Sequence, residues 1–434
     1  MNIKALKEQS PFILFLPFLV LYIFYVLRFH TDAMEGDEAR YIQFAQNLLH
    51  GFYSPPYPKI DLINGPGYPI LLVPFVALKL PLISITLFNA VLHYLSIVLL
   101  YRSVLLITDS IKKSLIVSVC WGSYFLAWQE MPCTMTETVT LFLISLFSFL
   151  LLRIFKEANK PVPYNQLILA GFILGFLILT KVIFAYAVVF LLVITTLIYL
   201  LNKASSAYKY LLYVIVAAMI TISPYLIYTY HLTGKVFYLS SEGGKVLYWM
   251  TSTNENEYGD WNNNYFTANC KEGGSFCNAD LIRKNHEEDI QRINNTKTVL
   301  ETDSLFKAMA VRNIKAHPVK YVKNWFANIG RLLFGFPASY YFQSPTTLVR
   351  IYINSLLLIG MLYSLFLTIL NWKNMPPQIL FLVALILLYL FDSSLVSAYP
   401  RQFTVIVPAV LIWMVYVIGG TIKINWSLKT TKES

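Results

Sequence analysis

About ten apolar segments, each close in length to a membrane-spanning helix, recur along this chain of 434 residues. A helix rises about 1.5 Å per residue and the hydrocarbon core of a bilayer is about 30 Å thick, so one crossing takes roughly 20 apolar residues. Because 57% of the residues are hydrophobic and only 13% are charged, a soluble globule is excluded. The sequence therefore predicts an all-α polytopic membrane protein. The expected spans lie near residues 11–28, 82–107, 113–130, 138–155, 165–180, 182–201, 209–230, 347–371, 377–396 and 402–421.

The distribution of lysine and arginine over the short connections predicts the orientation of these spans, because such residues collect on the cytoplasmic side. The apolar run 67–79 is short and interrupted by proline, and we interpret it as a re-entrant or interfacial helix. With ten crossings both termini then face the cytoplasm, and the first span is expected to stay in place as an anchor. The net charge of +11 follows from this topology, so no nucleic-acid partner is predicted. The basic residues on the predicted cytoplasmic side are Lys4, Lys7, Arg102, Lys112, Lys113, Arg153, Lys156, Lys160, Lys203, Lys209, Lys373, Lys423, Lys429 and Lys432.

Two long polar segments, residues 29–81 and 231–346, are predicted to face outward. The second is expected to form a small mixed α/β region, and its stretch 317–333 mixes basic and apolar residues as an amphipathic helix on a membrane surface does. Its Cys270 and Cys277 are close enough for a small-loop disulfide in an oxidising compartment, but two free thiols fit the sequence equally well. No neighbouring histidines complete a zinc set, so no metal site is predicted.

Charged residues gather directly after the first span, at Glu35, Asp37, Glu38 and Arg40. Charge at the mouth of a span is costly and usually marks a site that handles a charged group. Positions at three- and four-residue steps from Asp37 predict an amphipathic interfacial helix that closes at Gly51. Asp37 and Arg40 then share one face, and a carboxylate beside a cation stays ionised and able to accept a proton. The alternative is that Asp37 and Glu38 only stabilise the start of a helix.

Two further outward motifs follow this cluster. The first is Asn-Gly-Pro-Gly-Tyr-Pro at 64–69, whose glycines permit close backbone approach and whose prolines stiffen the entry into the short helix. The second is Glu137, at the start of the fourth span and three residues after Thr134. Its spacing fits a capping box, or else a carboxylate that faces the first loop and orients an acceptor or Arg40.

Lys181 and Arg401 depart from the cytoplasmic bias of the other basic residues, because both are expected near the outer interface. A half-buried cation there needs an anionic partner, either a phosphate or a carboxylate. Asp392 is the candidate carboxylate for Arg401. His93, in the second span, fits either a satisfied core histidine or a functional group.

The order of these motifs along almost the whole chain resembles the GT-C superfamily of membrane glycosyltransferases, most closely its aminoarabinose transferase and protein O-mannosyltransferase branch. Such enzymes transfer a sugar from a polyprenyl-phosphate donor outside the cytoplasmic membrane. Asn64-Gly65-Pro66 stands where aminoarabinose transferases carry Glu-Lys-Pro, so the resemblance does not extend to aminoarabinose as the sugar. The motifs that carry the resemblance are Gly36 to Tyr41, Asn64 to Pro69, Thr136-Glu137, Gly171 to Lys181, Ser223-Pro224-Tyr225, Ser240 to Gly244, His317-Pro318 and Tyr399-Pro400-Arg401.

The resemblance implies a GT-C-like organisation in which residues 1–230 form an N-terminal transmembrane module with a catalytic loop at 29–81. Residues 231–346 would cap the site, and residues 347–434 would add the last spans. It implies a polyprenyl-phosphate sugar as donor, a lipid, glycan or protein as acceptor, membrane lipids as surroundings and no divalent metal. The implied location is a bacterial or archaeal plasma (inner) membrane, with the site on the extracytoplasmic side. The implied roles are catalysis for Asp37 and Glu38, donor-phosphate binding for Arg40, Tyr41, Lys181 and Arg401, and acceptor or sugar orientation for Glu137, Tyr68 and His93.

The chemistry of such a transfer suits these residue types. Negative charge builds on the departing phosphate while the anomeric carbon becomes oxocarbenium-like, so catalysis needs cations at the phosphate and a carboxylate beside the acceptor hydroxyl. Arg40, Arg401 and Asp37 would supply them, and direct displacement predicts inversion at the anomeric carbon. Two other classes stay open, namely an O-antigen ligase or polymerase, whose reactive groups lie in a late outward loop, and a lipid-linked glycan transporter, which usually shows inverted repeats.

Overall fold

The computed structural model describes residues 10–34, 36–156, 162–201, 206–261, 279–340 and 345–421. Every regular element in these ranges is a helix, which confirms the all-α class. The mixed α/β character expected for residues 231–346 is not confirmed, because the described part of that segment contains helices and no strand. Its apolar positions recur at helical spacing, as Phe306, Met309 and Ala310 do, and all three are buried. The candidate disulfide residues Cys270 and Cys277 lie outside the described ranges.

The N-terminal half is a bundle in which α6 packs against α7 and α8, and α9 packs against α11. Small residues bring α9 and α11 close together, because a Cβ atom on Gly171 or Gly175 would overlap atoms of α11. The bounds in this half are α2 Pro11–Leu14, α3 Leu16–Phe29, α4 Asp37–Leu49, α5 Gly67–Ala77, α6 Leu82–Thr108, α7 Ile111–Gly122, η1 Phe125–Ala127, α8 Thr136–Lys156, α9 Tyr164–Thr180, α10 Phe184–Leu201 and α11 Ser206–Thr233.

The described residues include six helices that are long and apolar enough to cross a membrane, α6, α8, α10, α11, α16 and α17, which indicates a multi-pass membrane protein. The expected count of ten is not confirmed. The spans predicted at 11–28, 165–180 and 402–421 appear as shorter apolar helices, α3, α9 and α19. The span predicted at 113–130 was wrong in extent, since α7 ends at Gly122 and the chain turns ahead of the polar residues Gln129 and Glu130.

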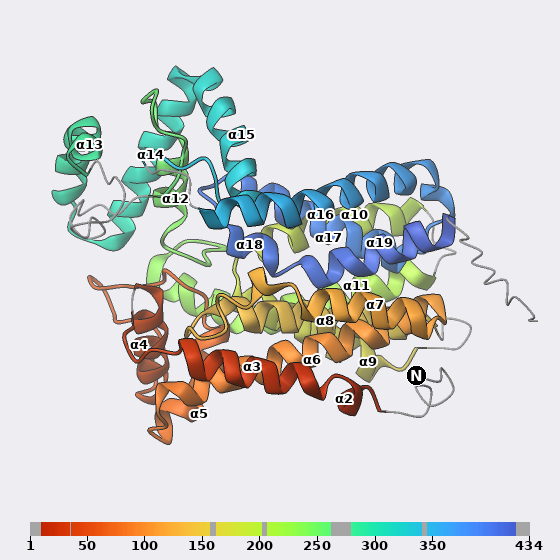
Figure 1. The fold of residues 1–434 in the computed structure, drawn as a ribbon. Coiled ribbons are helices and arrows are strands. Elements are labelled where there is room, and N and C mark those ends of the chain that lie inside the picture. Colours follow the sequence, from red (N-terminus) through yellow and green to blue (C-terminus); the bar gives the residue numbers. More distant parts are fainter. Residues whose placement is uncertain are drawn as a thin grey trace, which may run out of the picture.

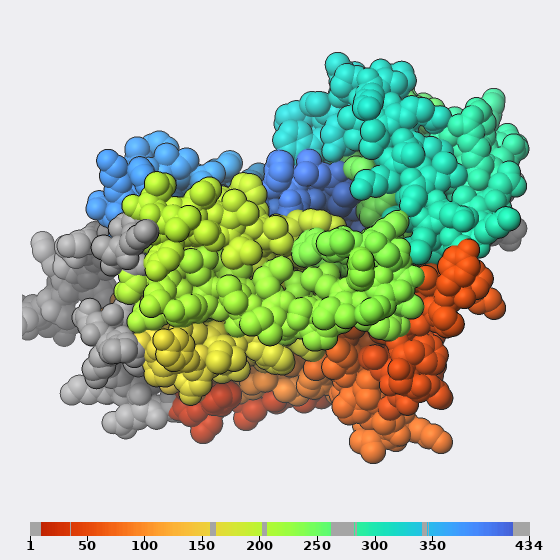
Figure 2. All heavy atoms as spheres, turned by 180° about the vertical axis from the view of Figure 1, so that it is seen from behind, coloured from red at the N-terminus to blue at the C-terminus, as the bar shows by residue number. Residues whose placement is uncertain are grey.

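The long helices lie side by side with their axes roughly parallel (Figure 1). The start of α2 and the end of α19 lie at one end of the bundle, while α4, α5 and the helices of residues 243–334 lie at the other, which we call the α4 end (Figure 1). Seen from behind, α11 covers one face and residues 279–334 extend beyond the bundle (Figure 2). The remaining bounds are α12 Gly243–Met250, α13 Ala279–Asn294, α14 Val299–Ala316, α15 Pro318–Phe334, α16 Pro345–Leu370, η2 Trp372–Asn374, α17 Pro377–Ser394, α18 Pro400–Thr404 and α19 Val407–Thr421.

Helix α15 exposes an apolar face and buries a polar one. Phe326 is 65% exposed, whereas Asn324 and Asn328 are buried. The amide group of Asn324 donates to the carbonyl of Met250 at 3.1 Å, and that of Asn328 donates to the carbonyl of Ser394 at 2.7 Å. An exposed apolar face of this kind suits contact with a bilayer surface, in line with the amphipathic pattern of the sequence here.

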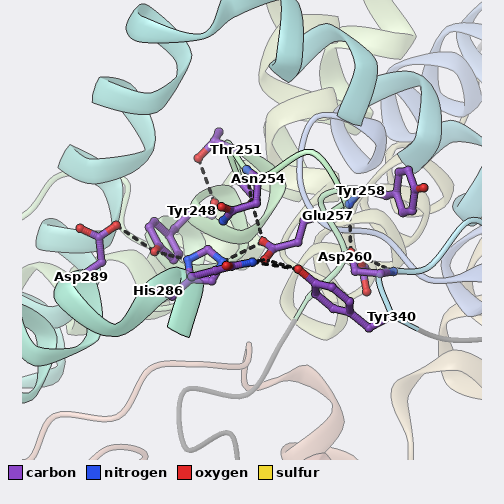
Figure 3. A network of polar contacts seen from close by, with 12 residues as sticks. Tyr248, Thr251, Asn254, Glu257, Tyr258, Asp260, His286, Asp289 and Tyr340 are labelled. Atoms are coloured by element: carbon purple, nitrogen blue, oxygen red, sulfur yellow. Dashed lines mark hydrogen bonds and ion pairs between the residues drawn. The ribbon is translucent and has the colours of Figure 1, made fainter. Parts of the chain in front are cut away.

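A buried polar network joins α12, α13 and the loop after α12 (Figure 3). His286 Nε2 lies 2.7 Å from Glu257 Oε2, and His286 Nδ1 lies 2.7 Å from the hydroxyl of Tyr248. The Tyr248 hydroxyl donates to Asp289 at 3.0 Å, and the Tyr340 hydroxyl donates to Glu257 at 2.9 Å. Because the members of a buried network depend on one another, this one fixes the helices of the segment in a single arrangement.

Replacing Glu257 with glutamine is expected to destabilise this segment by about 1–3 kcal/mol at neutral pH, because His286 loses its anionic partner. Burial alone raises the pKa of Glu257, but hydrogen bonds from His286, Asn285 and Ser252 outweigh burial and lower the pKa to about 2. A carboxylate with a lowered pKa stabilises the fold above its ordinary pKa and loses that contribution as the pH falls through the lowered value. The wild-type protein should therefore lose stability as the pH falls from 4.5, the ordinary pKa of a glutamate, to about 2, the pKa of Glu257 in the fold. The Glu257→Gln variant should lose less stability over the same pH range.

Thermal unfolding of the purified protein in detergent, followed over this pH range, checks the expectation. Glu288→Gln is the control, because the side chain of Glu288 is 80% exposed and its pairing with Arg292 lies at the surface. Identical pH profiles for wild type and Glu257→Gln would contradict it.

Candidate active site

Asp37 is the first residue of α4, and its carboxylate lies between two guanidinium groups. Arg40 Nη1 lies 2.9 Å from Asp37 Oδ1, and Arg401 Nη2 lies 3.4 Å from Asp37 Oδ2. The pairing with Arg40 confirms the shared helix face predicted from their spacing, and α4 ends at Leu49 with Gly51 at a φ of 85° just beyond it. The side chain of Asp37 is 30% exposed, so the carboxylate is held by cations and still accessible to a ligand.

The turn at 64–69 reaches this cluster through Asn64. Its Oδ1 accepts a hydrogen bond from Arg40 at 3.2 Å, and its Nδ2 donates to the hydroxyl of Tyr41 at 3.1 Å. Tyr41 is only 4% exposed, and burial raises its pKa well above the usual range, so the phenol stays protonated. Tyr68 is also buried and packs edge-on against Tyr41 with ring centroids 5.1 Å apart. Tyr41 therefore holds the Asn64 side chain, Tyr68 packs against Tyr41, and neither buried ring presents an open surface to a phosphate or a sugar.

Gly65 and Gly67 pack directly against the end of α9. A Cβ atom on Gly65 would overlap the carbonyl oxygen of Leu179, and one on Gly67 would lie 2.6 Å from the backbone nitrogen of Thr180. Glycine is needed at both positions for this approach. The contact holds the turn against the residue that follows α9, Lys181, whose backbone is extended.

Replacing Gly65 with alanine is expected to destabilise the protein by about 1–3 kcal/mol and to displace Lys181, because backbone atoms have to move. Gly243→Ala is the matched control, since a Cβ atom there meets nothing within 4 Å. Thermal unfolding midpoints in detergent compare the two variants with wild type. Equal unfolding midpoints for Gly65→Ala and Gly243→Ala would show that the turn accommodates the added methyl group without loss of stability, and would contradict the prediction.

Glu137 is buried at the start of α8 and joins two cations. Lys181 Nζ lies 2.9 Å from Glu137 Oε1, and Arg401 Nε lies 3.6 Å from the same oxygen. These partners correct two expectations, because Glu137 pairs with them rather than with Arg40, and Arg401 pairs with Glu137 rather than with Asp392. The reason is tertiary, since α8 packs against α18 and against α9. The Glu137 side chain is 4% exposed, so it contacts the two cations and has no open face for an acceptor.

These contacts form one alternating series of charges, Lys181, Glu137, Arg401, Asp37 and Arg40. The residues come from the ends of four different helical segments, α9, α8, α18 and α4. The series itself contains three cations and two carboxylates. A partly exposed guanidinium at such a position can bind an anionic ligand such as a phosphate.

Glu38, the second predicted catalytic carboxylate, holds a backbone segment. Its Oε1 accepts a hydrogen bond of 2.6 Å from the N–H of Thr134. This is the N–H that a capping box would direct to Glu137, so that alternative is not supported. Glu38 therefore ties α4 to the loop ahead of α8.

His93 lies in the core of the bundle and does not reach the charged series. It is fully buried on α6, stacked on Trp121 with ring centroids 5.2 Å apart and edge-on to Tyr22 at 4.8 Å. Its ring therefore faces α7 and α3, the helices that carry these aromatic partners. An orienting role for His93 toward a sugar or an acceptor is not supported.

The chain after α11 closes over the first loop. The N–H of Ser241 donates to the carbonyl of Leu62 at 3.0 Å, and the hydroxyl of Ser240 donates to the carbonyl of Ile63 at 2.7 Å. These hydrogen bonds attach the start of the segment that follows α11 to the residues next to Asn64. Among the described residues, no group of three or more His, Cys, Asp or Glu side chains is arranged to hold a metal ion.

A cavity of about 360 Å³ lies beside Arg401, and two of its charged wall residues, Glu130 and Arg350, were not predicted. Glu130 is the last residue of the span predicted at 113–130, and Arg350 lies near the start of the span predicted at 347–371. A charged residue at the edge of an apolar segment can indicate a functional site. The sequence did not show that Glu130 and Arg350 lie together beside Arg401, because the fold brings them there.

No protein-family model matches the chain, and no curated protein matches it. Among solved structures it is similar to a crystal structure of ArnT from Cupriavidus metallidurans bound to undecaprenyl phosphate. The TM-score is 0.38 and the sequence identity is 12%, over 94% of this chain and 77% of that one. A likeness this weak carries no argument about function, so the site has to be interpreted from its own residues.

Proposed function

We propose that this protein is a GT-C-type glycosyltransferase that moves a sugar from a polyprenyl-phosphate donor to an envelope acceptor at the α4 end of the bundle. The observation that carries the proposal is the partly exposed Asp37 carboxylate held between Arg40 and Arg401. The order of motifs along the sequence agrees with it. The apolar bundle offers a surface for a polyprenyl chain, and Arg40 and Arg401 are cations that can bind its phosphate.

Asp37 acts as the general base in this proposal. The acceptor hydroxyl gives its proton to the Asp37 carboxylate as its oxygen attacks the anomeric carbon, and the bond from that carbon to the phosphate oxygen breaks with its electron pair moving to the phosphate. Arg40 and Arg401 stabilise the charge that builds there. A donor phosphate that draws Arg401 toward itself also frees one Asp37 oxygen to accept the proton. Attack from the side opposite the phosphate inverts the anomeric carbon.

The position of the charges favours this proposal over a transporter. Transporters place their ion and substrate sites near the bilayer midplane, at broken helices related by an internal repeat. The alternating series instead lies at helix ends, all at the α4 end of the bundle. This is where a lipid headgroup at the interface would meet it.

Mass spectrometry of lipid-linked glycans and envelope polymers, with and without the gene, tests the proposed function. Deleting the gene is expected to remove one sugar from an envelope lipid, glycan or protein and to enlarge the pool of its lipid-linked donor. An unchanged envelope together with an unchanged donor pool would overturn the proposal. Complementation with the wild-type gene is the control.

The α4 end is expected to face the extracytoplasmic side, and labelling of Lys59→Cys tests this. Lys59 is exposed in the first outward loop. In a background whose four native cysteines are replaced by serine, an impermeant maleimide should label this position in intact cells. Labelling that appears only after the cells are broken would place the site on the cytoplasmic side and contradict the proposed location.

A further inference from the structure

The cavity beside Arg401 has the size and lining of an anion site. Its volume of about 360 Å³ falls in the usual range for ligand pockets. It lies among the loop that follows η1, the first turns of α16, and α18, where Arg401, Arg350 and Glu130 supply its charged groups. Asn354 and Tyr399 add polar atoms to the wall. The proposed chemistry at Asp37 uses Arg401 and leaves Arg350 and Glu130 without a role.

Arg350 is held in place by a neutral partner. Its Nη2 lies 2.6 Å from Gln129 Oε1, and no carboxylate of the described residues lies within 4.0 Å of its guanidinium nitrogens. Arg401, by comparison, is shared between two carboxylates. A half-buried guanidinium without a carboxylate partner binds phosphate oxygens well, because its planar N–H groups match their geometry.

The protonation state of Glu130 sets part of the charge of the cavity wall. Burial, and then the negative charge of Glu137, raise the pKa of Glu130 to about 7 against the opposing positive charges nearby. The protonated carboxyl offers an O–H donor to a phosphate, whereas the carboxylate repels it. The charged and titratable groups that face Glu130 are Glu137, Arg401, Lys181, Arg350, Cys133 and Tyr25.

We infer that this cavity binds the phosphate group of a lipid phosphate through Arg350 and Arg401, and that Glu130 takes part in binding only while it carries a proton. The inference rests on the proposed function for the identity of the lipid and deepens it, because it adds Arg350 and Glu130 to the groups around the phosphate that Arg401 contacts. Binding is measurable without any sugar transfer, which keeps the two claims separable.

Equilibrium binding of farnesyl phosphate to the full chain in nanodiscs tests the inference. Arg350→Gln should weaken binding about ten- to 100-fold, the equivalent of one lost charge-assisted hydrogen bond, and Arg350→Lys should restore part of it. Above pH 7 the wild-type affinity should fall about tenfold per pH unit relative to Glu130→Gln, because binding then requires uptake of one proton. Dividing the affinity of the wild-type protein by that of Glu130→Gln at each pH removes the effect of the ligand's own ionisation. Arg312→Gln, which alters an exposed cation outside the cavity lining, should bind as wild type does.

Two competitors identify the source of the phosphate. Inorganic phosphate that displaces farnesyl phosphate at equal concentration would show a site for free phosphate and overturn the lipid assignment. Phosphatidylglycerol in the nanodisc should compete weakly, because its phosphodiester carries a single charge. Wild-type affinity and pH dependence in both Arg350→Gln and Glu130→Gln would overturn the inference outright.

Asp37→Asn separates this inference from the proposed function. The variant should bind farnesyl phosphate in the cavity and lose sugar transfer. If binding depends on Arg350 and Glu130 but the wild-type protein transfers no sugar, the cavity assignment is supported and the enzyme proposal is overturned. Sugar transfer that is lost in Asp37→Asn but unaffected in Arg350→Gln and Glu130→Gln would support the enzyme proposal and contradict the cavity assignment.

Discussion

Sugar transfer is expected to fall about 10²- to 10⁴-fold when Asp37 is replaced with asparagine, the usual effect of losing a general base. Asparagine matches aspartate in size and can still accept a hydrogen bond from Arg40, but it cannot take the acceptor's proton. The rate at which a radiolabelled polyprenyl-phosphate sugar is consumed in proteoliposomes, at matched protein content, measures the effect. The loss should appear in kcat more than in KM, because the proton moves only during the reaction.

Asp32→Asn is the matched control for this variant. Asp32 lies in the same outward loop, five positions before Asp37, and its side chain is 84% exposed. The control should transfer sugar at the wild-type rate. An Asp37→Asn protein that is folded, present at the wild-type level and equally active would remove the central residue of the proposal.

Arg401→Gln is expected to reduce sugar transfer about 10²- to 10³-fold, because the departing phosphate loses one of its charge partners. The same change leaves Glu137 with Lys181 as its remaining ion-pair partner and removes one of the two cations at Asp37. Lysine at 401 keeps the charge but cannot contact both carboxylates and a phosphate with one planar group, so Arg401→Lys should recover only part of the rate.

Thermal unfolding separates an effect on chemistry from an effect on folding in the Arg401 variants. Arg292→Gln, which alters a half-exposed arginine of α13, is the control and should leave rate and stability unchanged. A full recovery of rate in Arg401→Lys would show that charge alone matters at this position. Wild-type activity in Arg401→Gln would exclude Arg401 from phosphate stabilisation.

The parts of the site that the sequence predicted are those set by local spacing. Asp37 and Arg40 are three residues apart on one helix, so their contact follows from helical geometry once α4 is recognised. The glycines at 65 and 67 indicated a close backbone approach, and the structure identifies its partner as the end of α9. The membrane class followed in the same way from apolar segment lengths.

The parts that the sequence left open depend on tertiary contacts. Arg401 and Asp37 are separated by 364 positions, and Glu137 and Lys181 by 44, so no periodicity connects them. The choice of Asp392 for Arg401 rested on nearness along the chain, and packing of α18 against α8 decided otherwise. The extent of α7 was missed because apolar composition alone does not mark where a helix turns within an apolar segment.

The short length of α7 has a consequence for the residues that follow it. Its 12 residues span about 18 Å, about 12 Å less than the hydrocarbon core of a typical bilayer. The remainder of the segment, residues 123–130, is η1 and turns rather than α-helix. Backbone of this kind is tolerated at membrane depth only where protein or a water-filled cavity surrounds it, so the loop that carries Glu130 has to be shielded from lipid by the helices around it.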